Sequence, residues 1–110
     1  HAHGLSSKSA DREEAQAIRA VFGAAADRVP VTAAKSYFGN LGAAGGLVEL
    51  AASLLALQHE RLFPVLNYET PDPECPLNVA RPGAAARPGD CVLNVSFTPQ
   101  GQASAVIVRR

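Results

Sequence analysis

The stretch that decides the fold runs from Ala43 to Leu57 and reads AAGGLVELAASLLAL. It contains no proline and is rich in alanine and leucine, which are strong helix formers, so it is predicted to form a helix. Glu49 is its only charged residue, and no face of the helix is consistently polar. A helix that is apolar on every side is normally buried on every side. Gly45 and Gly46 cost about 1 kcal/mol each in helix propensity, which a closely packed neighbouring backbone would explain.

Such a buried helix is demanding for a chain of 110 residues, a length that fits one small domain. A domain of this size encloses a helix on all sides only with difficulty. The sequence also contains no methionine. We therefore expect residues 1–110 to be an internal piece of a longer protein, incomplete on its own. Standing alone, such a piece should expose helix faces and strand edges, and should become ordered beside its missing half, in a swapped dimer, or around a rearranged small core.

The flanking sequence predicts helices that alternate with strands, which indicates the α/β class. A helix is expected over Asp11–Phe22, because Asp11 and Glu14 have the spacing of a capping box. Gly23 follows the last apolar residue and should end this helix. The other elements expected are a strand at Val29–Thr32, a turn at Tyr37–Gly42, an extended piece at Arg61–Asn67, irregular chain at Pro71–Pro76, an exposed loop at Arg81–Gly89, and a hairpin of Cys91–Phe97 and Ala103–Val108.

The overall composition argues against several classes of partner. Ten basic residues balance ten acidic ones, and aromatic residues make up only 5% of the chain. We therefore expect no nucleic-acid partner, because such proteins rely on basic surfaces and stacking side chains. No apolar stretch is long enough for a membrane span, so none is expected. Two cysteines are too few for the disulfide framework of a small secreted domain, which favours a reducing, cytoplasmic setting.

A series of short motifs carries the functional information. In chain order they are His3-Gly4, Asp11-x-x-Glu14, Lys35-Ser36, Gly39-Asn40-x-Gly42-Ala43-Ala44-Gly45, Glu49 and Asn67-x-x-x-Pro71-Asp72-Pro73. With this order and spacing, the chain resembles the C-terminal part of a β-ketoacyl-acyl-carrier-protein synthase of the thiolase-like superfamily. The resemblance covers essentially all of residues 1–110. It implies the C-terminal portion of a ketosynthase domain, with a layered mixed sheet and a buried helix.

The resemblance also implies an activity and its partners. Enzymes of this family are acyltransferases that lengthen fatty-acid or polyketide chains by decarboxylating a malonyl thioester and condensing the carbanion with an enzyme-bound acyl group. The implied partners are acyl carrier protein with its acyl or malonyl thioester, the remaining N-terminal half of the ketosynthase, and a second subunit in a homodimer or heterodimer. No cofactor is implied. The nucleophilic cysteine of the family belongs to the N-terminal half, so the isolated chain is expected to be inactive.

His3, Asn40 and Lys35 are the catalytic residues that the resemblance implies. His3 matches the histidine of the family's His-Gly-Thr motif, and a neutral imidazole there would donate from Nε2 to the thioester carbonyl as the enolate forms. Leu5 replaces the threonine of that motif. Asn40 stands where most elongating members have a second histidine. Two interpretations of Asn40 stay open: a working donor, as in the Cys-His-Asn set of chain-priming and chalcone-synthase-like enzymes, or a lost catalytic residue.

Lys35 matches the lysine that lies beside the active site in this family, and Glu49 is its expected supporting partner. An unpaired carboxylate within an apolar helix would cost several kcal/mol. We therefore expect either a Lys35–Glu49 ion pair or a water-filled site.

Cys75 lies in a proline-rich segment and Cys91 begins a predicted strand, and neither has a neighbour at a spacing that activates a thiol. No metal site is expected, because the cysteines and histidines show no recognisable ligand spacing.

The segment Val95–Gly101 departs from the family pattern, in which Asn-Ser-Phe-Gly-Phe-Gly-Gly forms a mobile gate over the acyl pocket. Pro99 fixes a φ angle in this segment, so acyl gating is expected to work differently, or the pocket takes another substrate.

The resemblance leaves two functions of different classes open: a divergent β-ketoacyl synthase, or a non-catalytic partner subunit that resembles a chain-length factor. The presence of His3 favours the first, whereas Asn40 and the missing gate favour the second. A free-standing binding domain fits poorly with the apolar helix.

Overall fold

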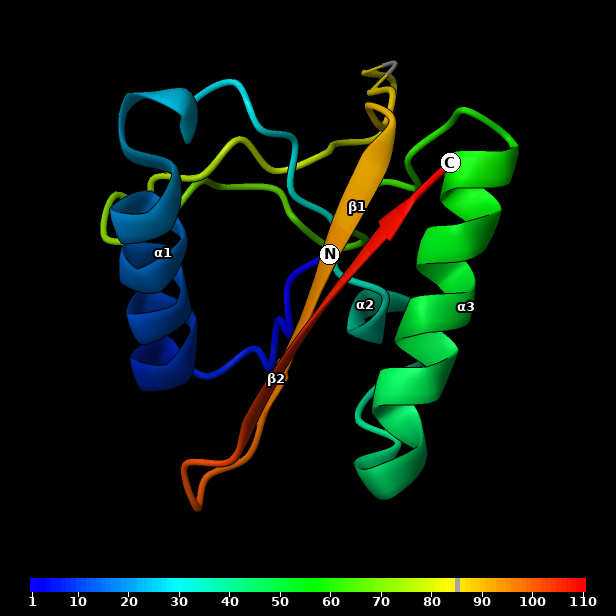
Figure 1. Cartoon of the computed structure of the whole chain (residues 1–110). Coiled ribbons are helices and arrows are strands. Elements are labelled where there is room, and N and C mark those ends of the chain that lie inside the picture. The colour runs from blue at the N-terminus through cyan, green and yellow to red at the C-terminus, as the bar shows by residue number, and fades with distance from the viewer. Residues whose placement is uncertain (85) are drawn as a thin grey trace.

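The computed structural model describes residues 1–84 and 86–110. A two-stranded ribbon lies between two long helices in the view of Figure 1. The helices are α1 (Lys8–Phe22), α2 (Lys35–Phe38) and α3 (Gly45–Gln58), with 3-10 turns at Gly23–Ala25 and Gly42–Ala44, and the strands are β1 (Cys91–Phe97) and β2 (Ala103–Arg109). This combination of helices and strands in one compact unit confirms the predicted α/β class.

Helix α1 begins earlier than predicted, at Lys8, and the predicted capping box is wrong. Asp11 lies within the first turn, and its carboxylate accepts a hydrogen bond from the Ser6 N–H at 3.2 Å. Glu14 instead accepts hydrogen bonds from amides of the preceding loop. Those N–H groups are partly or fully buried, so leaving them without an acceptor would cost more free energy than leaving a solvated helix end uncapped. The predicted end at Gly23, where φ is 53°, is confirmed.

The closing hairpin agrees with the prediction. Strands β1 and β2 pair antiparallel, with Cys91 opposite Arg109 and Phe97 opposite Ala103. The turn between them is closed by hydrogen bonds from Thr98 N–H to Gln102 O at 2.8 Å and from Gly101 N–H to Thr98 O at 3.0 Å. The rigid Pro99 therefore lies in a tight turn.

Main-chain hydrogen bonds continue past β1 into the N-terminal segment. The His1 nitrogen donates to Leu93 O at 2.7 Å, and Val95 N–H donates to His1 O at 3.0 Å. The next residue along, Ala2, donates to Thr32 O at 2.8 Å. The N-terminal segment thus lies between β1 and the chain around Thr32, and this places the residues that follow it at the centre of the molecule.

The predicted strand at Val29–Thr32 is wrong as a strand. It is reduced to one parallel bridge between Val31 and Val79. Pro30 has no N–H to donate, which interrupts any longer ladder at this position. The predicted turn at Tyr37–Gly42 also begins within the last residues of α2.

Helix α3 is predicted correctly in position, but not in its surroundings. Its polar residues Glu49 and Ser53 face inward and are 0% and 2% exposed. Leu47 and Leu55 face outward and are 75% and 54% exposed. The expectation of a helix buried on every side is therefore wrong for this chain, whereas the expectation of exposed helix faces is confirmed. None of the helices in the described ranges has the length and hydropathy needed to cross a bilayer.

The segment between α3 and β1 is irregular throughout its described residues except for the bridge at Val79. The prediction for Pro71–Pro76 is therefore confirmed. This segment is anchored by hydrogen bonds from Leu62 N–H to Ala86 O at 3.0 Å and from Val65 N–H to Ala80 O at 2.8 Å. Part of the predicted loop at Arg81–Gly89, namely residue 85, lies outside the described residues.

Candidate active site

His3 lies in a buried loop whose backbone is held from two sides. The carboxylate of Glu14, on α1, accepts hydrogen bonds from the N–H groups of His3 and Gly4 at 2.6 and 2.9 Å. Gly4 has a φ angle of 56°, and a Cβ atom on it would lie 2.7 Å from the Cβ of Ala33. Glycine is therefore required here by both backbone conformation and space. These contacts hold the loop that carries His3 next to the chain that leads into α2.

The ammonium group of Lys35 is the centre of the site. It forms an ion pair with Glu49, and the two side chains are only 7% and 0% exposed. It also donates to the backbone carbonyl of His3 at 2.8 Å and lies 3.1 Å from His3 Nδ1. Of the two solutions expected for Glu49, an ion pair with Lys35 or a water-filled site, the structure shows the ion pair. One oxygen of Glu49, Oε2, is buried with no partner among the described residues.

These contacts determine the tautomer of His3. An ammonium group has three N–H donors and no acceptor, and Lys35 faces three acceptors: the Glu49 carboxylate, His3 O and His3 Nδ1. His3 Nδ1 therefore accepts, so the proton of the neutral ring is on Nε2. Burial lowers the pKa of His3 below its usual 6.5, and the Lys35 charge lowers it further, against smaller opposing effects of nearby carboxylates. The ring is thus maintained as a neutral Nε2–H donor.

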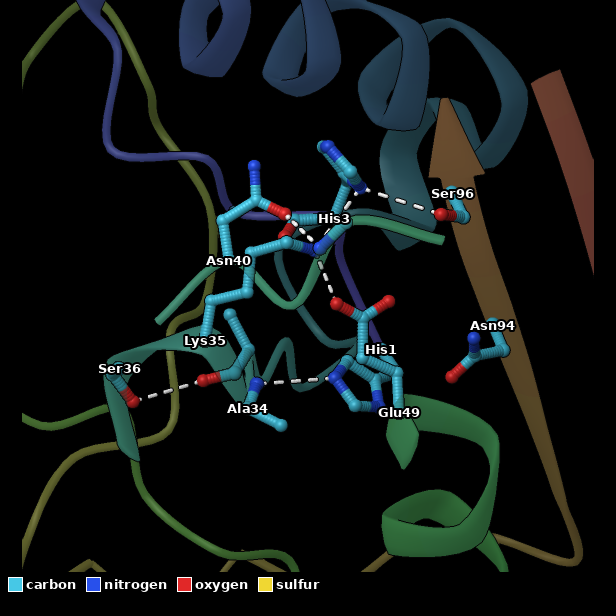
Figure 2. Close-up of polar contacts among 12 residues, drawn as sticks. His1, His3, Ala34, Lys35, Ser36, Asn40, Glu49, Asn94 and Ser96 are labelled. Atoms are coloured by element: carbon cyan, nitrogen blue, oxygen red, sulfur yellow. Dashed lines mark hydrogen bonds and ion pairs between the residues drawn. The ribbon is translucent and has the colours of Figure 1, made fainter. Parts of the chain in front are cut away.

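Two residues of β1 complete the surroundings of the imidazole. The Phe97 ring lies against the His3 ring with a centroid separation of 4.3 Å and an interplanar angle of 42°. The Ser96 hydroxyl is 3.5 Å from His3 Nδ1. Figure 2 shows Lys35 and Ser96 on the same side of the ring, and the second ring nitrogen on the far side. No described residue accepts a hydrogen bond from that second nitrogen, Nε2, so this donor is available to a ligand.

Asn40 lies on the exposed loop between α2 and the 3-10 turn that precedes α3. Its Oδ1 atom accepts a hydrogen bond from Gly42 N–H at 3.0 Å, which leaves the carboxamide N–H₂ group as the free end. In Figure 2 this nitrogen and the outer nitrogen of His3 point to the same side, away from Glu49. The catalytic role of Asn40 stays a prediction.

Comparison with known proteins identifies the family to which this site belongs. Residues 1–69 match the model of the family described as beta-ketoacyl synthase, C-terminal domain. The chain belongs to the β-ketoacyl synthase family. Among its relatives are the tetracenomycin polyketide synthase ketoacyl synthase alpha subunit of Streptomyces glaucescens (41% identical over 111 residues), nodulation protein E of a Rhizobium species (32% over 110), and 3-oxoacyl-[acyl-carrier-protein] synthase 2 of Coxiella burnetii (34% over 110).

These alignments cover 100% of this chain but only 26% to 27% of each relative. The chain therefore spans about a quarter of the length of the curated relatives that it matches. The matches support the synthase family and a partial thiolase-like C-terminal domain, as the motifs predicted.

A second polar cluster, not predicted from the sequence, lies beneath the candidate site. His1 Nδ1 is 2.8 Å from the Ser53 hydroxyl, and His1 Nε2 accepts a hydrogen bond from Ala34 N–H at 3.0 Å. The Ser53 hydroxyl also lies 2.8 Å from Asn94 Oδ1. One signal for this cluster was present: Glu49 and Ser53 are four residues apart, so they share one face of an otherwise apolar helix.

The role of Glu14 was also missed, because its spacing from Asp11 fitted a capping box equally well. Nothing in the linear pattern distinguishes a carboxylate that caps its own helix from one that binds a distant loop.

Neither cysteine is among the described residues that contact the His3 imidazole or the Lys35 ammonium. Burial raises the pKa of the Cys75 thiol, with a further contribution from the nearby Asp72 carboxylate, so this thiol is a poor nucleophile. Cys91 is exposed at the start of β1. Within residues 1–84 and 86–110, no group of three His, Cys, Asp or Glu side chains converges as metal ligands would.

Proposed function

We propose that this chain is the C-terminal part of a divergent β-ketoacyl synthase that carries out decarboxylative Claisen condensation in fatty-acid or polyketide synthesis. The observation that carries the proposal is the set of three acceptors around the Lys35 ammonium. These acceptors leave His3 as a neutral ring with a free Nε2–H donor. A donor of this kind suits an oxygen that gains negative charge during a reaction.

In the proposed step, the carbonyl oxygen of a malonyl thioester accepts the hydrogen bond from His3 Nε2–H. The bond between the carboxylate carbon and Cα breaks, carbon dioxide leaves, and the electron pair forms an enolate whose oxygen carries the charge. The enolate carbon then attacks an acyl thioester on a cysteine supplied by the remaining part of the synthase, and the cysteine thiolate leaves. His3 stays neutral, because hydrogen bonding to the oxygen is sufficient and no proton needs to be transferred.

The other site residues have distinct roles in this proposal. The Asn40 N–H₂ group is the second donor to the enolate oxygen. Lys35 holds the tautomer of His3, and Glu49 neutralises the Lys35 charge within an apolar environment, where an unpaired ion would be costly. Lys35 and Glu49 therefore act through His3 and transfer no proton in the main step.

The proposed partners are those of a complete synthase. Acyl carrier protein presents the malonyl or acyl thioester, the N-terminal half supplies the nucleophile, and a second subunit forms a homodimer or heterodimer. The exposed leucines of α3 support the need for the N-terminal half, because an apolar helix face of this kind is normally covered. On this proposal the isolated chain is inactive.

A second candidate is a non-catalytic subunit that resembles a chain-length factor and shapes the acyl tunnel. The position of Asn40 favours it, since an exposed carboxamide whose oxygen bonds its own loop is also what a decayed site would show. The residue at the nucleophile position upstream distinguishes the candidates. A cysteine on a small-residue turn supports catalysis, whereas glutamine or another residue supports the partner subunit.

The test uses the full-length protein and measures carbon dioxide release from malonyl-carrier thioester. Replacing His3 by alanine should lower turnover about 100- to 1,000-fold, the usual effect of removing one oxyanion donor, and N40A should lower it measurably. H59A is the matched control, because His59 is exposed at the end of α3 and has no place in the site. Unchanged turnover in N40A would refute the oxyanion role of Asn40. A wild-type protein without activity alone, but required by an active partner, would favour the second candidate.

A further inference from the structure

We infer that His1 is a positioning residue that determines where the Lys35 ammonium lies, and through it the tautomer of His3. The inference rests on the proposed synthase function. His1 is two residues before His3 and does not point to the same side of the site. Its imidazole instead lies beneath Lys35, on the side of the α3 helix (Figure 2).

Both ring nitrogens of His1 are engaged, and their partners determine its protonation. Ala34 N–H can only donate, so His1 Nε2, 3.0 Å away, must carry a lone pair. The proton of the neutral ring is therefore on Nδ1, which donates to the Ser53 hydroxyl at 2.8 Å. A protonated His1 would direct an N–H group at the Ala34 N–H and lose this contact. The His1 ring can thus bridge its two partners only in one neutral tautomer.

The two partners belong to the elements that carry the Lys35–Glu49 pair. Ala34 is the residue immediately before Lys35, at the N-terminus of α2, and is 3% exposed. Ser53 lies one helical turn after Glu49 on α3, and its hydroxyl is within 2.9 Å of the Glu49 carbonyl. His1 therefore ties the start of α2 to the inner face of α3 at the level of the ion pair.

The ring is itself held in place by its surroundings. Its main chain is bonded to β1 through Leu93 and Val95, and the edge of the ring faces Phe63, with a centroid separation of 5.5 Å and an interplanar angle of 73°. His1 is thus held through its main chain and through both ring nitrogens, between the start of α2 and the inner face of α3. A shift of α2 relative to α3 would move the Lys35 ammonium away from one of its three acceptors.

The consequence for His3 follows from that geometry. If Lys35 no longer donates to His3 Nδ1, the ring is free to carry its proton on either nitrogen. The fraction with a free Nε2–H donor then decreases, although substrate still binds. Loss of His1 should therefore reduce kcat more than it raises KM, because a small displacement of a catalytic group can cost up to about 100-fold in rate.

The test compares His1→Leu, His1→Asn and His1→Gln in the full-length protein. Leucine removes both hydrogen bonds but keeps apolar bulk, whereas a carboxamide offers one acceptor and one donor with a separation close to that of the ring nitrogens. H1L should lower kcat for malonyl-carrier decarboxylation about 10- to 100-fold with little change in KM. H1N or H1Q should restore much of the loss. H59L is the matched control, and its kcat should equal that of the wild type.

A second measurement does not depend on turnover. Nitrogen-15 NMR of labelled histidine in the full-length protein reports the tautomer of His3, whose signal is assigned by its absence in H3Q. The wild type should show Nε2 protonated and Nδ1 unprotonated, whereas H1L should show a mixture. An unchanged His3 tautomer together with an unchanged kcat in H1L would overturn the inference. An inactive wild type with the expected tautomer change would refute the synthase function alone, so the two failures are distinguishable.

Discussion

The two faces of α3 have opposite chemistry and opposite surroundings. The inner face presents Glu49 and Ser53, which are almost fully buried, whereas the outer face presents Leu47, Leu54 and Leu55, which are 75%, 46% and 54% exposed. Hydropathy alone would place these faces the other way round. The inner face tolerates burial because Lys35 pairs with one oxygen of Glu49, and His1 and Asn94 contact the Ser53 hydroxyl.

The two faces of α3 contribute different interactions. The inner face organises the charges and hydrogen bonds that orient His3. No described residue covers the outer face. Burying its leucines against a partner would favour association by about 25 cal/mol for each Å² of apolar surface removed from water. Mutations on the two sides of the helix can therefore be compared separately.

The largest expected effect comes from breaking the buried pair on the inner face. E49L should destabilise the full-length protein by about 3–5 kcal/mol, because it leaves the Lys35 ammonium buried without its counter-ion. Urea unfolding followed by circular dichroism measures the change. The double variant K35M/E49L should recover much of that stability, since an apolar pair of similar volume is often tolerated.

The matched control for this prediction is E74L. Glu74 pairs with Arg12 at the surface, where the two side chains are 58% and 44% exposed. Exposed pairs contribute little to stability, so E74L should change the free energy of unfolding far less than E49L. Similar losses in the two variants would contradict the distinction between the buried and exposed ion pairs.

A smaller effect is expected where the His3 loop meets the chain before α2. G4A should destabilise the full-length protein by about 2–4 kcal/mol, through left-handed strain of about 1–2 kcal/mol and crowding against Ala33. G101A is the comparison: Gly101 has a φ angle of 87°, but a Cβ there meets no described atom within 4 Å. It should show the strain alone. Thermal unfolding of both variants measures the difference, and an equal loss would rule out the crowding.

The outer face of α3 can be tested in the isolated 110-residue chain. L47E/L55E should reduce concentration-dependent self-association by at least severalfold, measured by analytical ultracentrifugation, because it removes most of the exposed apolar stripe. V21E is the control, since Val21 is 76% exposed on α1, away from α3. A monomeric wild-type chain with a sharp, concentration-independent unfolding transition would contradict the need for a covering partner.

The smallest effect is the pH dependence that arises from His3. The pKa of His3 is lowered in the folded protein. Above pH 6.5 the ring is therefore neutral in both the folded and the unfolded state, and protonation of His3 does not reduce the free energy of unfolding. As the pH falls below 6.5, the unfolded state binds the proton first, and stability decreases. An NMR titration of His3 in the full-length protein should give a midpoint below 6.5.

K35M/E49Q sharpens this measurement. Lys35 lowers the pKa of His3 more than Glu49 raises it, so removing both charges should move the midpoint upward. A downward movement, or a wild-type midpoint at or above 6.5, would contradict the arrangement of charges around the ring.

The sequence predicted α3 and the closing hairpin, because both depend on short-range patterns: helix propensity, and strand alternation around a turn. For Glu49 it left two solutions open, an ion pair with Lys35 or a water-filled site, because a lone charge in an apolar segment is costly. It also identified His3 as the leading candidate through the motif in which it lies.

Only the tertiary structure decided which side of α3 is buried, which amides Glu14 binds, and how the neutral tautomers of His1 and His3 are selected. Each of these depends on groups far apart in the chain: Ser53 is 52 residues from His1, and Lys35 is 32 residues from His3. Hydrogen bonds are directional and short, so their partners follow from the packing of whole elements, which no local pattern of residues encodes.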